Sequence, residues 1–381
     1  MLAVKTVQQL YTPTLEVLYM LEQFRWMLNR SMEIGFAENV SSLKSLSLKT
    51  YKHLAEYDAV SYYKLCAISA AAGILRNYRK AVRRGENPCK PYARRLRLTT
   101  CYGFKIQDNA LVLPLRAREH VRIPLTPHTR AVIEGYAVRS VTLTEENLAL
   151  AYAKHVEQVQ PRGFMGIDRN LNNVTVVMSD NTVLRQDLSR ATHVKATYRQ
   201  IRSRLRRNDV RIRRRVNGKY GRKERERVKQ ILHHASKLIV EQAKVKQFGI
   251  VMETLTGLRR LYRRGNWQGR WYRGRMNSWS YSELQRQIAY KAAWDGVPVV
   301  YVSPHGTSAK CSMCGSRLAR VPEENRLLRC ATCGVTVDRD VNAARNILAR
   351  GMRFVPFAPA IEAMVAESRA IGESAKSMQA S

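Results

Sequence analysis

The second half of the 381-residue chain predicts an α/β fold, and three observations lead to this prediction. Three short β-like runs separated by tight turns come first, at residues 164–168, 173–178 and 182–188. Helical and strand patterns then alternate, as helix 190–246, strand 248–253, helix 281–295 and strand 297–302. Two CxxC pairs lie between the last strand and a final helix at 341–350. This is the element order of an RNase H-like domain that carries an inserted zinc ribbon.

The first half of the chain shows a different pattern. Apolar residues recur at helical spacing between residues 14 and 85, and Gly85 ends this helical region. A loop with two prolines follows it. Residues 96–157 then contain short alternating runs separated by turn residues, a pattern typical of a small antiparallel barrel or sheet. The dipeptide Gln160-Pro161 marks the expected boundary with the second half.

The charge balance indicates a polyanionic partner. The chain has 66 Lys and Arg against 30 Asp and Glu, a net charge of +36. Such a surplus repels itself unless a polyanion neutralises it, so we expect nucleic acid. A basic protein without such a partner is the alternative. A membrane is not expected, because no apolar run has the length of a span or the form of a signal peptide.

Four of the seven cysteines stand in two CxxC pairs, each followed by glycine, with fifteen residues between the pairs. The two-residue gap lets one tight turn aim both sulfur atoms at one ion, and four thiolates close a tetrahedral zinc site without an open position. A redox dithiol pair or unrelated cysteines are the alternatives. The pattern also indicates a reducing, cytoplasmic compartment. The expected zinc ligands are Cys311, Cys314, Cys330 and Cys333.

Three carboxylates stand at the ends of predicted elements. Asp168 ends the run FMGID, Glu253 ends FGIVME, and Asp340 begins the last helix. A carboxylate at a buried strand end needs a partner, and Mg²⁺ or Mn²⁺ supplies one. Such groups converging on metal ions would hydrolyse a phosphodiester. A turn residue, a strand-end cap and a helix N-cap are the alternatives. Asp338 competes with Asp340, which we favour because it lies beside the Asn/Ala face of the helix.

Two regions have the composition of nucleic-acid contacts. Residues 195–229 hold 16 Lys and Arg and three acids, a density suited to phosphates rather than to a merely solvated helix. Residues 258–275 hold seven Arg among aromatic side chains, which suits stacking on unpaired bases and gating of the active site. A basic loop with its aromatics packed on the core is the alternative. The candidate contacts are Arg202, Arg206, Arg213, Arg214, Trp267, Arg270 and Trp271.

Several strings between about residues 163 and 350 resemble the TnpB family, the RNA-guided endonucleases of insertion-sequence transposons that are related to compact type V CRISPR effectors. They are GIDRNLNNVTVV, VMETLTGL, the run from NSWSYSEL to KCSMCG, and CATCGVTVDRDVNAARNIL. Matched by position, the RuvC triad of this family falls on Asp168, Glu253 and Asp340, and its zinc cysteines fall on the two CxxC pairs. The resemblance implies a RuvC/RNase H-like nuclease domain at 161–306 and 334–350 with the zinc ribbon at 307–333.

Over residues 1–160 the resemblance lies in organisation. It implies a wedge-like β-barrel at 1–13 and 86–160 that is interrupted by a helical recognition insertion at 14–85. The tail at 351–381 is rich in Ala, Ser and Glu, and we expect it to be disordered. The implied partners are a guide RNA from the transposon end and a double-stranded DNA target in the prokaryotic cytoplasm, with a monomer favoured.

Three hypotheses about function follow. The leading one is an RNA-guided, Mg-dependent DNA endonuclease that cuts beside a short flanking motif and leaves a 3′-hydroxyl and a 5′-phosphate. The second is an RNA-independent RuvC-like transposase or nuclease that uses the same carboxylates. The third is a guide-dependent DNA-binding repressor in which the triad is vestigial.

Overall fold

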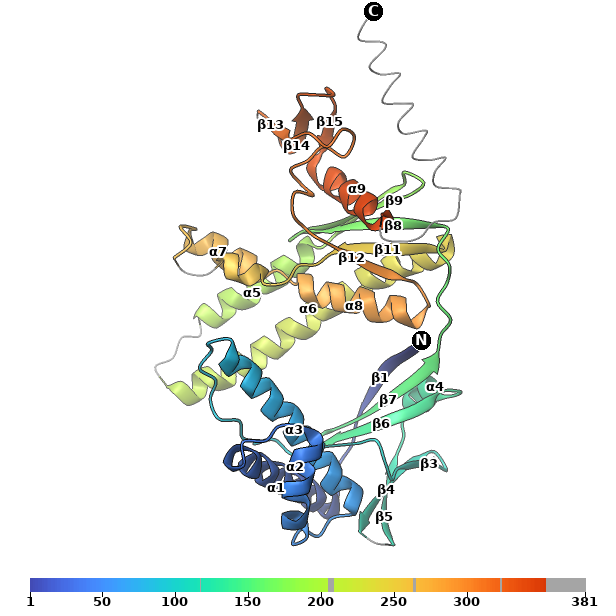
Figure 1. Cartoon of the computed structure of the whole chain (residues 1–381), viewed down its shortest axis with the longest axis vertical. Helices are drawn as coiled ribbons and strands as arrows, with labels where there is room; N and C mark the ends of the chain where they lie inside the picture. Colours follow the sequence, from blue (N-terminus) through green and yellow to red (C-terminus); the bar gives the residue numbers. More distant parts are fainter. Residues whose placement is uncertain (117, 205–208, 263–264, 323, 354–381) are drawn as a thin grey trace, which may run out of the picture. The chain divides into compact units, whose positions relative to one another are not determined.

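The computed structural model describes residues 1–116, 118–204, 209–262, 265–322 and 324–353 (Figure 1). The predicted contact Arg206 and residues 354–381 of the predicted tail lie outside these residues. The prediction that the tail begins at Gly351 was wrong, because the last helix continues to Met352 and buries Gly351. The chain forms two compact units, one from Leu2 to His155 and one from Val156 onward together with Met1. No helix in the described parts combines the length and the apolar character needed to cross a membrane.

In the sequence of the first unit, three of its helices lie between its first and second strands. Strand β1 (Leu2–Leu10) leads into α1 (Leu15–Ala37), α2 (Leu43–Thr50), a 3₁₀ turn (Tyr51–Leu54) and α3 (Ser61–Arg83). The Thr14 hydroxyl caps α1 by accepting a hydrogen bond from the Val17 amide. Helices α1 and α3 pack closely because α3 buries small side chains at Ala67, Ala71 and Ala72.

The strands of this unit pair into two antiparallel sheets. One has the order β1-β7-β6-β2 and the other β3-β4-β5. Their bounds are β2 (Arg97–Thr100), β3 (Lys105–Gln107), β4 (Ala110–Arg116), β5 (Glu119–Pro124), β6 (Ala137–Thr144) and β7 (Asn147–His155), with helix α4 (Pro127–Ile133) before β6.

The predicted antiparallel barrel or sheet corresponds, among the described strands, to two sheets that have no hydrogen-bonded ladder between them. A register shift after Pro114 twists the β4–β5 ribbon, because proline cannot donate to a ladder and a bulge increases twist. The Gln9 side chain bridges the sheets instead. Its Nε2 donates to the Pro124 carbonyl at 2.8 Å, and its Oε1 accepts from the Thr126 amide at 3.0 Å.

The second unit is built on one mixed sheet with the order β10-β9-β8-β11-β12. Strands β8 (Gly163–Arg169), β9 (Asn173–Met178) and β10 (Val183–Asp187) form an antiparallel meander, and β11 (Phe248–Glu253) and β12 (Val299–Val302) run parallel to β8. The predicted strands are confirmed within two residues. This topology confirms the RNase H-like element order that the sequence predicted.

Helices cover both faces of this sheet (Figure 1). Helices α5 (Ser189–Arg204), α6 (Val210–Lys246) and α8 (Tyr281–Trp294) pack on the face that includes Met165 and Ile167. Helix α9 (Arg339–Met352) packs on the face that includes Phe164 and Val251. All seven residues of β8 are buried, as expected for a strand covered on both faces.

The prediction of one helical region over 190–246 was wrong in its continuity. A new helix begins at Val210, because Asp209 is its N-cap and accepts hydrogen bonds from the amides of Arg211 and Ile212. Helix α6 ends at Gln247, which adopts a left-handed conformation with φ of 55°.

Helix α9 lies directly on the sheet because two glycines leave room for it. A Cβ atom on Gly166 of β8 would lie 2.2 Å from the Ala344 carbonyl oxygen and 2.6 Å from the Leu348 amide nitrogen. A Cβ on Gly351 would lie 2.3 Å from a Val251 methyl group. The height of α9 above the sheet is therefore set by the helix backbone against Gly166 and by the Val251 side chain against Gly351.

The zinc-ribbon segment forms a small antiparallel sheet between β12 and α9. Its strands are β13 (Leu318–Val321), β14 (Glu324–Cys330) and β15 (Thr336–Asp338), in that order. Strand β15 ends where α9 begins, so the ribbon connects directly to the helix.

Gly166→Ala should destabilise the second unit by on the order of 3 kcal/mol, because the added methyl group meets helix backbone that cannot move aside. Gly218→Ala is the matched control. Gly218 lies within α6 with nothing within 4 Å of its Cβ position, so this change should stabilise by about 0.5–1 kcal/mol. Thermal unfolding of the two variants measures the difference, and equal effects would contradict the close approach.

Candidate functional site

Two of the three predicted carboxylates lie side by side at the ends of neighbouring strands. Ile167 pairs with Met252 across β8 and β11, so Asp168 and Glu253 occupy the next position on each strand. Side chains alternate along a strand, which places Asp168 with Phe164 and Glu253 with Val251 on the α9 face. Both residues are only 8% exposed.

The third carboxylate, Asp340, lies in the first turn of α9 and faces the same place. Its Oδ2 accepts a hydrogen bond from Asn173 Nδ2 at 3.4 Å and pairs with Arg326 of β14. Asp338 has a different role. One of its oxygens accepts from the amides of Asp340 and Val341, which makes it the N-cap of α9. Asp340, rather than Asp338, therefore remains the proposed third carboxylate of the site.

The other oxygen of Asp338 is also occupied, since Arg185 of β10 pairs with it at 2.8 Å. A carboxylate that caps a helix and bonds to an arginine has little capacity left for a metal ion. Asp338 instead fixes the end of β15 and the start of α9.

Burial perturbs the two carboxylates at the strand ends. The pKa of Asp168 is raised to about 7, chiefly by burial; the 2.8 Å hydrogen bond from Asn170 opposes this shift, and the nearby charges of Glu253 and Asp340 add to it. Burial also raises the pKa of Glu253, while the Thr307 hydroxyl at 2.6 Å opposes the shift. Mutual repulsion among buried carboxylates is the electrostatic condition that a divalent cation relieves.

The donor set suits Mg²⁺ or Mn²⁺, because both prefer carboxylate oxygens. Polar neighbours hold each carboxylate separately: Asn170 holds Asp168, Thr307 holds Glu253, and Asn173 and Arg326 hold Asp340. Among the described residues, the cysteines are the one group of three or more His, Cys, Asp or Glu whose ligand atoms all lie within 4.8 Å. A metal at the carboxylates thus requires them to draw closer.

Arg169, the residue after Asp168, is a buried cation that the sequence analysis did not identify. Its Nη2 donates to the Glu253 carbonyl at 2.5 Å and its Nη1 to Gln285 Oε1 at 2.7 Å. Burial lowers its pKa, and the charges of Glu253 and Asp168 oppose that shift. Arg169 therefore fixes the end of β11 from the opposite face of the sheet. The feature of the sequence that could have identified Arg169 is its position directly after an acid at a strand end.

The four predicted zinc cysteines converge on one point. The Sγ atoms of Cys311 and Cys333 are 3.7 Å apart, and those of Cys314 and Cys330 are 3.4 Å apart. Four sulfur atoms at about 2.3 Å around a tetrahedral zinc would be roughly 3.8 Å apart, so the cluster fits this ion. Both knuckles turn through a glycine at positive φ, 78° at Gly315 and 70° at Gly334.

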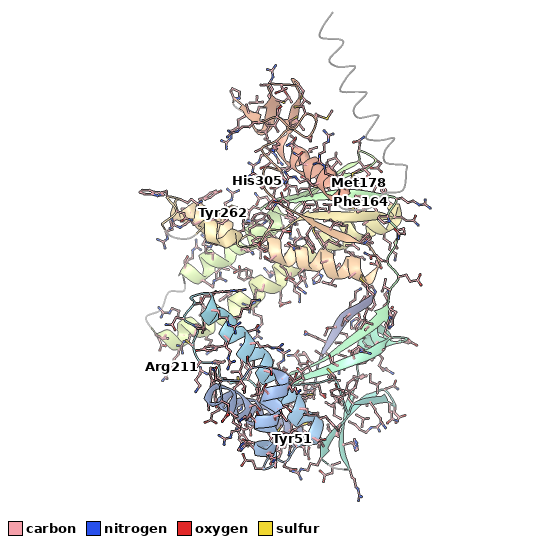
Figure 2. All side chains as sticks on the ribbon, viewed as in Figure 1. Tyr51, Phe164, Met178, Arg211, Tyr262 and His305 are labelled. Atoms are coloured by element: carbon pink, nitrogen blue, oxygen red, sulfur yellow. The ribbon has the colours of Figure 1, made fainter. Side chains whose placement is uncertain are left out.

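The predicted nucleic-acid residues are spread over α5, α6 and the segment before α8. Arg213 and Arg214 are exposed on α6, whereas Arg202 pairs with Glu224 of α6 at 2.5 Å. Trp267 is fully exposed and Trp271, in α7 (Arg270–Asn277), is 84% exposed. The alternative that these two aromatics pack on the core is therefore wrong. Figure 2 shows the side chains of this region around Tyr262.

A groove of about 370 Å³ lies between α5 and α7. Arg199, Trp271 and Arg275 supply charge and an aromatic face, and Asn172 belongs to the turn between β8 and β9. That turn also contains Asn170, which bonds to Asp168. The groove thus shares the β8–β9 turn with the carboxylates.

The chain is similar in sequence to several known proteins. Residues 281–347 match the family model described as Cas12f1-like, TNB domain. A TnpB-like protein of Methanocaldococcus jannaschii is 29% identical over 259 residues, which cover 64% of this chain and 91% of that protein. The CRISPR-associated endodeoxyribonuclease Cas12f1 of Sulfoacidibacillus thermotolerans is 33% identical over 141 residues, 36% of this chain and 28% of that protein.

A solved structure has a similar fold. The chain in the cryo-EM structure of a Cas12f1–sgRNA–target DNA complex aligns with a TM-score of 0.63 and 16% identity, over 87% of this chain and 82% of that one. At this identity the similarity concerns the fold alone.

Without Mg²⁺ the protein should lose stability as the pH rises, because Asp168 must ionise in a buried site. Its pKa is about 7 in the folded protein against an ordinary value of 3.8. The contribution of neutral Asp168 to the free energy of unfolding is fully present below about pH 4. It decreases as the pH rises above that value and is lost once the pH has passed about 7. Asp168→Asn avoids this loss, so at about pH 8 we expect the variant to be more stable by on the order of 3 kcal/mol.

Thermal unfolding of zinc-loaded protein without Mg²⁺, at about pH 5.5 and about pH 8, measures this effect. Glu241→Gln, on the exposed face of α6, is the matched control and should leave the Tm unchanged. Adding Mg²⁺ should raise the Tm of the parent more than that of Asp168→Asn. A stability difference that is the same at both pH values would contradict the buried-charge argument.

Proposed function

This chain belongs to the TnpB family, and we propose that it is an RNA-guided DNA endonuclease of a transposon. One observation carries the proposal: Asp168, Glu253 and Asp340 lie near one another on one face of the sheet, at two strand ends and a helix start. The similar fold in a Cas12f1–sgRNA–target DNA complex supports RNA and DNA as the partners.

We assign the three carboxylates as ligands of Mg²⁺ or Mn²⁺. When bound, the metal supplies an activated water and neutralises the charge that develops on the scissile phosphate. The chain's own contribution is to hold the ligands apart and oriented: Asn170 and Thr307 each fix one oxygen of a carboxylate. Hydrolysis leaves a 3′-hydroxyl and a 5′-phosphate.

Target choice would come from base pairing with the guide, because the protein contacts such a duplex through its shape and backbone. We assign reading of a short flanking motif to the wedge-like sheets and helices of the first unit. The four cysteines would hold a structural zinc. We retain a monomer as the working state.

The test begins with protein expressed together with its flanking transposon DNA. We expect one discrete RNA to copurify, and the complex to cut a matched duplex only with Mg²⁺ or Mn²⁺. Asp168→Ala should keep the RNA and reduce cleavage by at least about 1,000-fold, since it removes a metal ligand. Glu241→Gln is the control and should cut at the parent rate.

Each other outcome favours a different hypothesis. Heterogeneous nucleic acid that salt removes, with Asp168-dependent cleavage or strand joining, would favour an RNA-independent transposase or nuclease. Discrete RNA and target binding without any cleavage would favour a repressor. Cleavage that persists in Asp168→Ala would refute the active-site assignment.

We further propose that the groove between α5 and α7 holds the unpaired strand on its way to the carboxylates. Trp271 offers a face for a base, and Arg199 and Arg275 offer charge for phosphates. Exposed tryptophans beside arginines are what sequence-tolerant binding of single strands requires. Because the groove shares the β8–β9 turn with Asp168, a strand bound there would lie beside the metal ligands.

Trp271→Leu should weaken binding of a single-stranded oligonucleotide by about 10-fold, as expected for the loss of one stacked base. Trp271→Phe, which keeps an aromatic face, should lose less than about 3-fold. Fluorescence anisotropy at fixed salt measures both. Equal losses in the two variants would contradict stacking, and unchanged binding and cleavage in a Trp267→Ala, Trp271→Ala double variant would exclude this segment altogether.

A further inference from the structure

Three side chains on one face of α9 hold the loop that connects β12 to the first zinc knuckle. They are Asn342, Asn346 and Arg350, at four-residue spacing, which places them above one another on a helix. We call these three side chains the α9 ladder. Arg350 donates to the carbonyls of Ser303 and His305 at 2.7 and 2.8 Å. Figure 2 labels His305 on this loop.

The next step of this ladder is Asn346. Its Nδ2 donates to the Thr307 and Lys310 carbonyls, both at 2.8 Å. The loop therefore follows the helix through its main-chain oxygens rather than through apolar contacts. A loop held in this way keeps one conformation as long as the helix is in place.

Asn342 completes the ladder at the zinc knuckle. It is fully buried, its Nδ2 donates to the Lys310 carbonyl at 2.8 Å, and its Oδ1 accepts from the Ser312 amide at 2.8 Å. These two partners flank Cys311. One asparagine thus clamps the first cysteine to the helix whose first turn carries Asp340.

Thr307 connects this loop to the carboxylates. Its hydroxyl donates to Glu253 Oε1 at 2.6 Å, and its carbonyl is the one that Asn346 holds. The hydroxyl also lies 3.0 Å from the Pro304 carbonyl, and its contact with Glu253 is the shorter of the two. One oxygen of Glu253 is thereby fixed.

We propose that Thr307 is a positioning residue for Glu253, and that the four-cysteine knuckle and the α9 ladder hold Thr307 in place. The zinc site then does more than stabilise the ribbon, because it sets the loop that orients a ligand of the catalytic metal. Hydrogen-bond partners of this kind typically change metal affinity or activity by about 10–100-fold when they are removed. The inference rests on the proposed assignment of Glu253 as a metal ligand.

The experiment compares Thr307→Val, which keeps the shape and removes the hydroxyl, with Thr307→Ser, which keeps the hydroxyl. Mn²⁺ binding to zinc-loaded protein without nucleic acid is followed by electron paramagnetic resonance, with Asp168→Ala as background. We expect Thr307→Val to bind Mn²⁺ at least about 10-fold more weakly and Thr307→Ser to stay within about 3-fold of the parent. The Mn²⁺ concentration for half-maximal cleavage should shift by the same factor, and the KM for DNA should not change.

Asn346→Ala provides a second variant that touches neither a carboxylate nor a cysteine. It should weaken Mn²⁺ binding in the same direction with its zinc content unchanged, because it frees the Thr307 carbonyl. A lower Tm with parental Mn²⁺ affinity in both Thr307→Val and Asn346→Ala would overturn the inference, since a purely structural role predicts that result.

Mn²⁺ binding to Asp168→Ala and to Thr307→Val distinguishes an error in the metal site from an error in the role of Thr307. If Asp168→Ala binds Mn²⁺ as the parent does, the proposed metal site itself is wrong. If Asp168→Ala loses the ion while Thr307→Val keeps it, the metal site stands and the positioning role of Thr307 is refuted.

Discussion

The second unit depends on one close approach, in which the backbone of α9 rests on β8 at Gly166. Any side chain at that position would meet the Ala344 carbonyl and lift the helix from the sheet. With the helix in contact, its first turn lies beside the two strand ends, and Asp340 joins Asp168 and Glu253. The face of α9 that bears Asn342, Asn346 and Arg350 is then close enough to bond to the loop after β12. The absence of a side chain at Gly166 thus determines the geometry of both proposed metal sites.

The carboxylate cluster opposes folding, and the surrounding structure compensates for it. Burial disfavours the charged forms of Asp168 and Glu253, and the charges of Glu253 and Asp340 add to this effect at Asp168. Neutral donors from Asn170 and Thr307 offset part of this, and Arg169 ties the end of β11 to α8 from the other face. Such local strain is expected where a site is arranged for a ligand rather than for stability.

The sequence predicted the parts of this fold that local patterns encode. Short apolar runs predicted the strands of the second unit, and two of these runs end in the carboxylates Asp168 and Glu253. The paired CxxC spacing predicted the cysteine cluster. The break at Asp209 was missed because a basic, weakly amphipathic region has no apolar period to interrupt. The division of the first unit into two sheets was missed because strand pairing depends on contacts between distant residues. Thr307 and Asn346 were missed for the same reason, since their partners lie 54 and 39 residues away in the sequence.

The position of the ribbon in the chain explains why it can influence the carboxylates. Its entry is the loop that bears Thr307, beside Glu253, and its exit is β15, whose last residue Asp338 caps α9 two positions before Asp340. A module with few buried side chains of its own folds when its metal binds. Its two ends lie beside two carboxylates that are 87 residues apart in the sequence, so under our proposal metal-dependent folding of the ribbon also orders the surroundings of both. Under our proposal, the zinc cluster influences the carboxylates through the point at which the ribbon is inserted in the chain, rather than through contacts of the cysteines themselves.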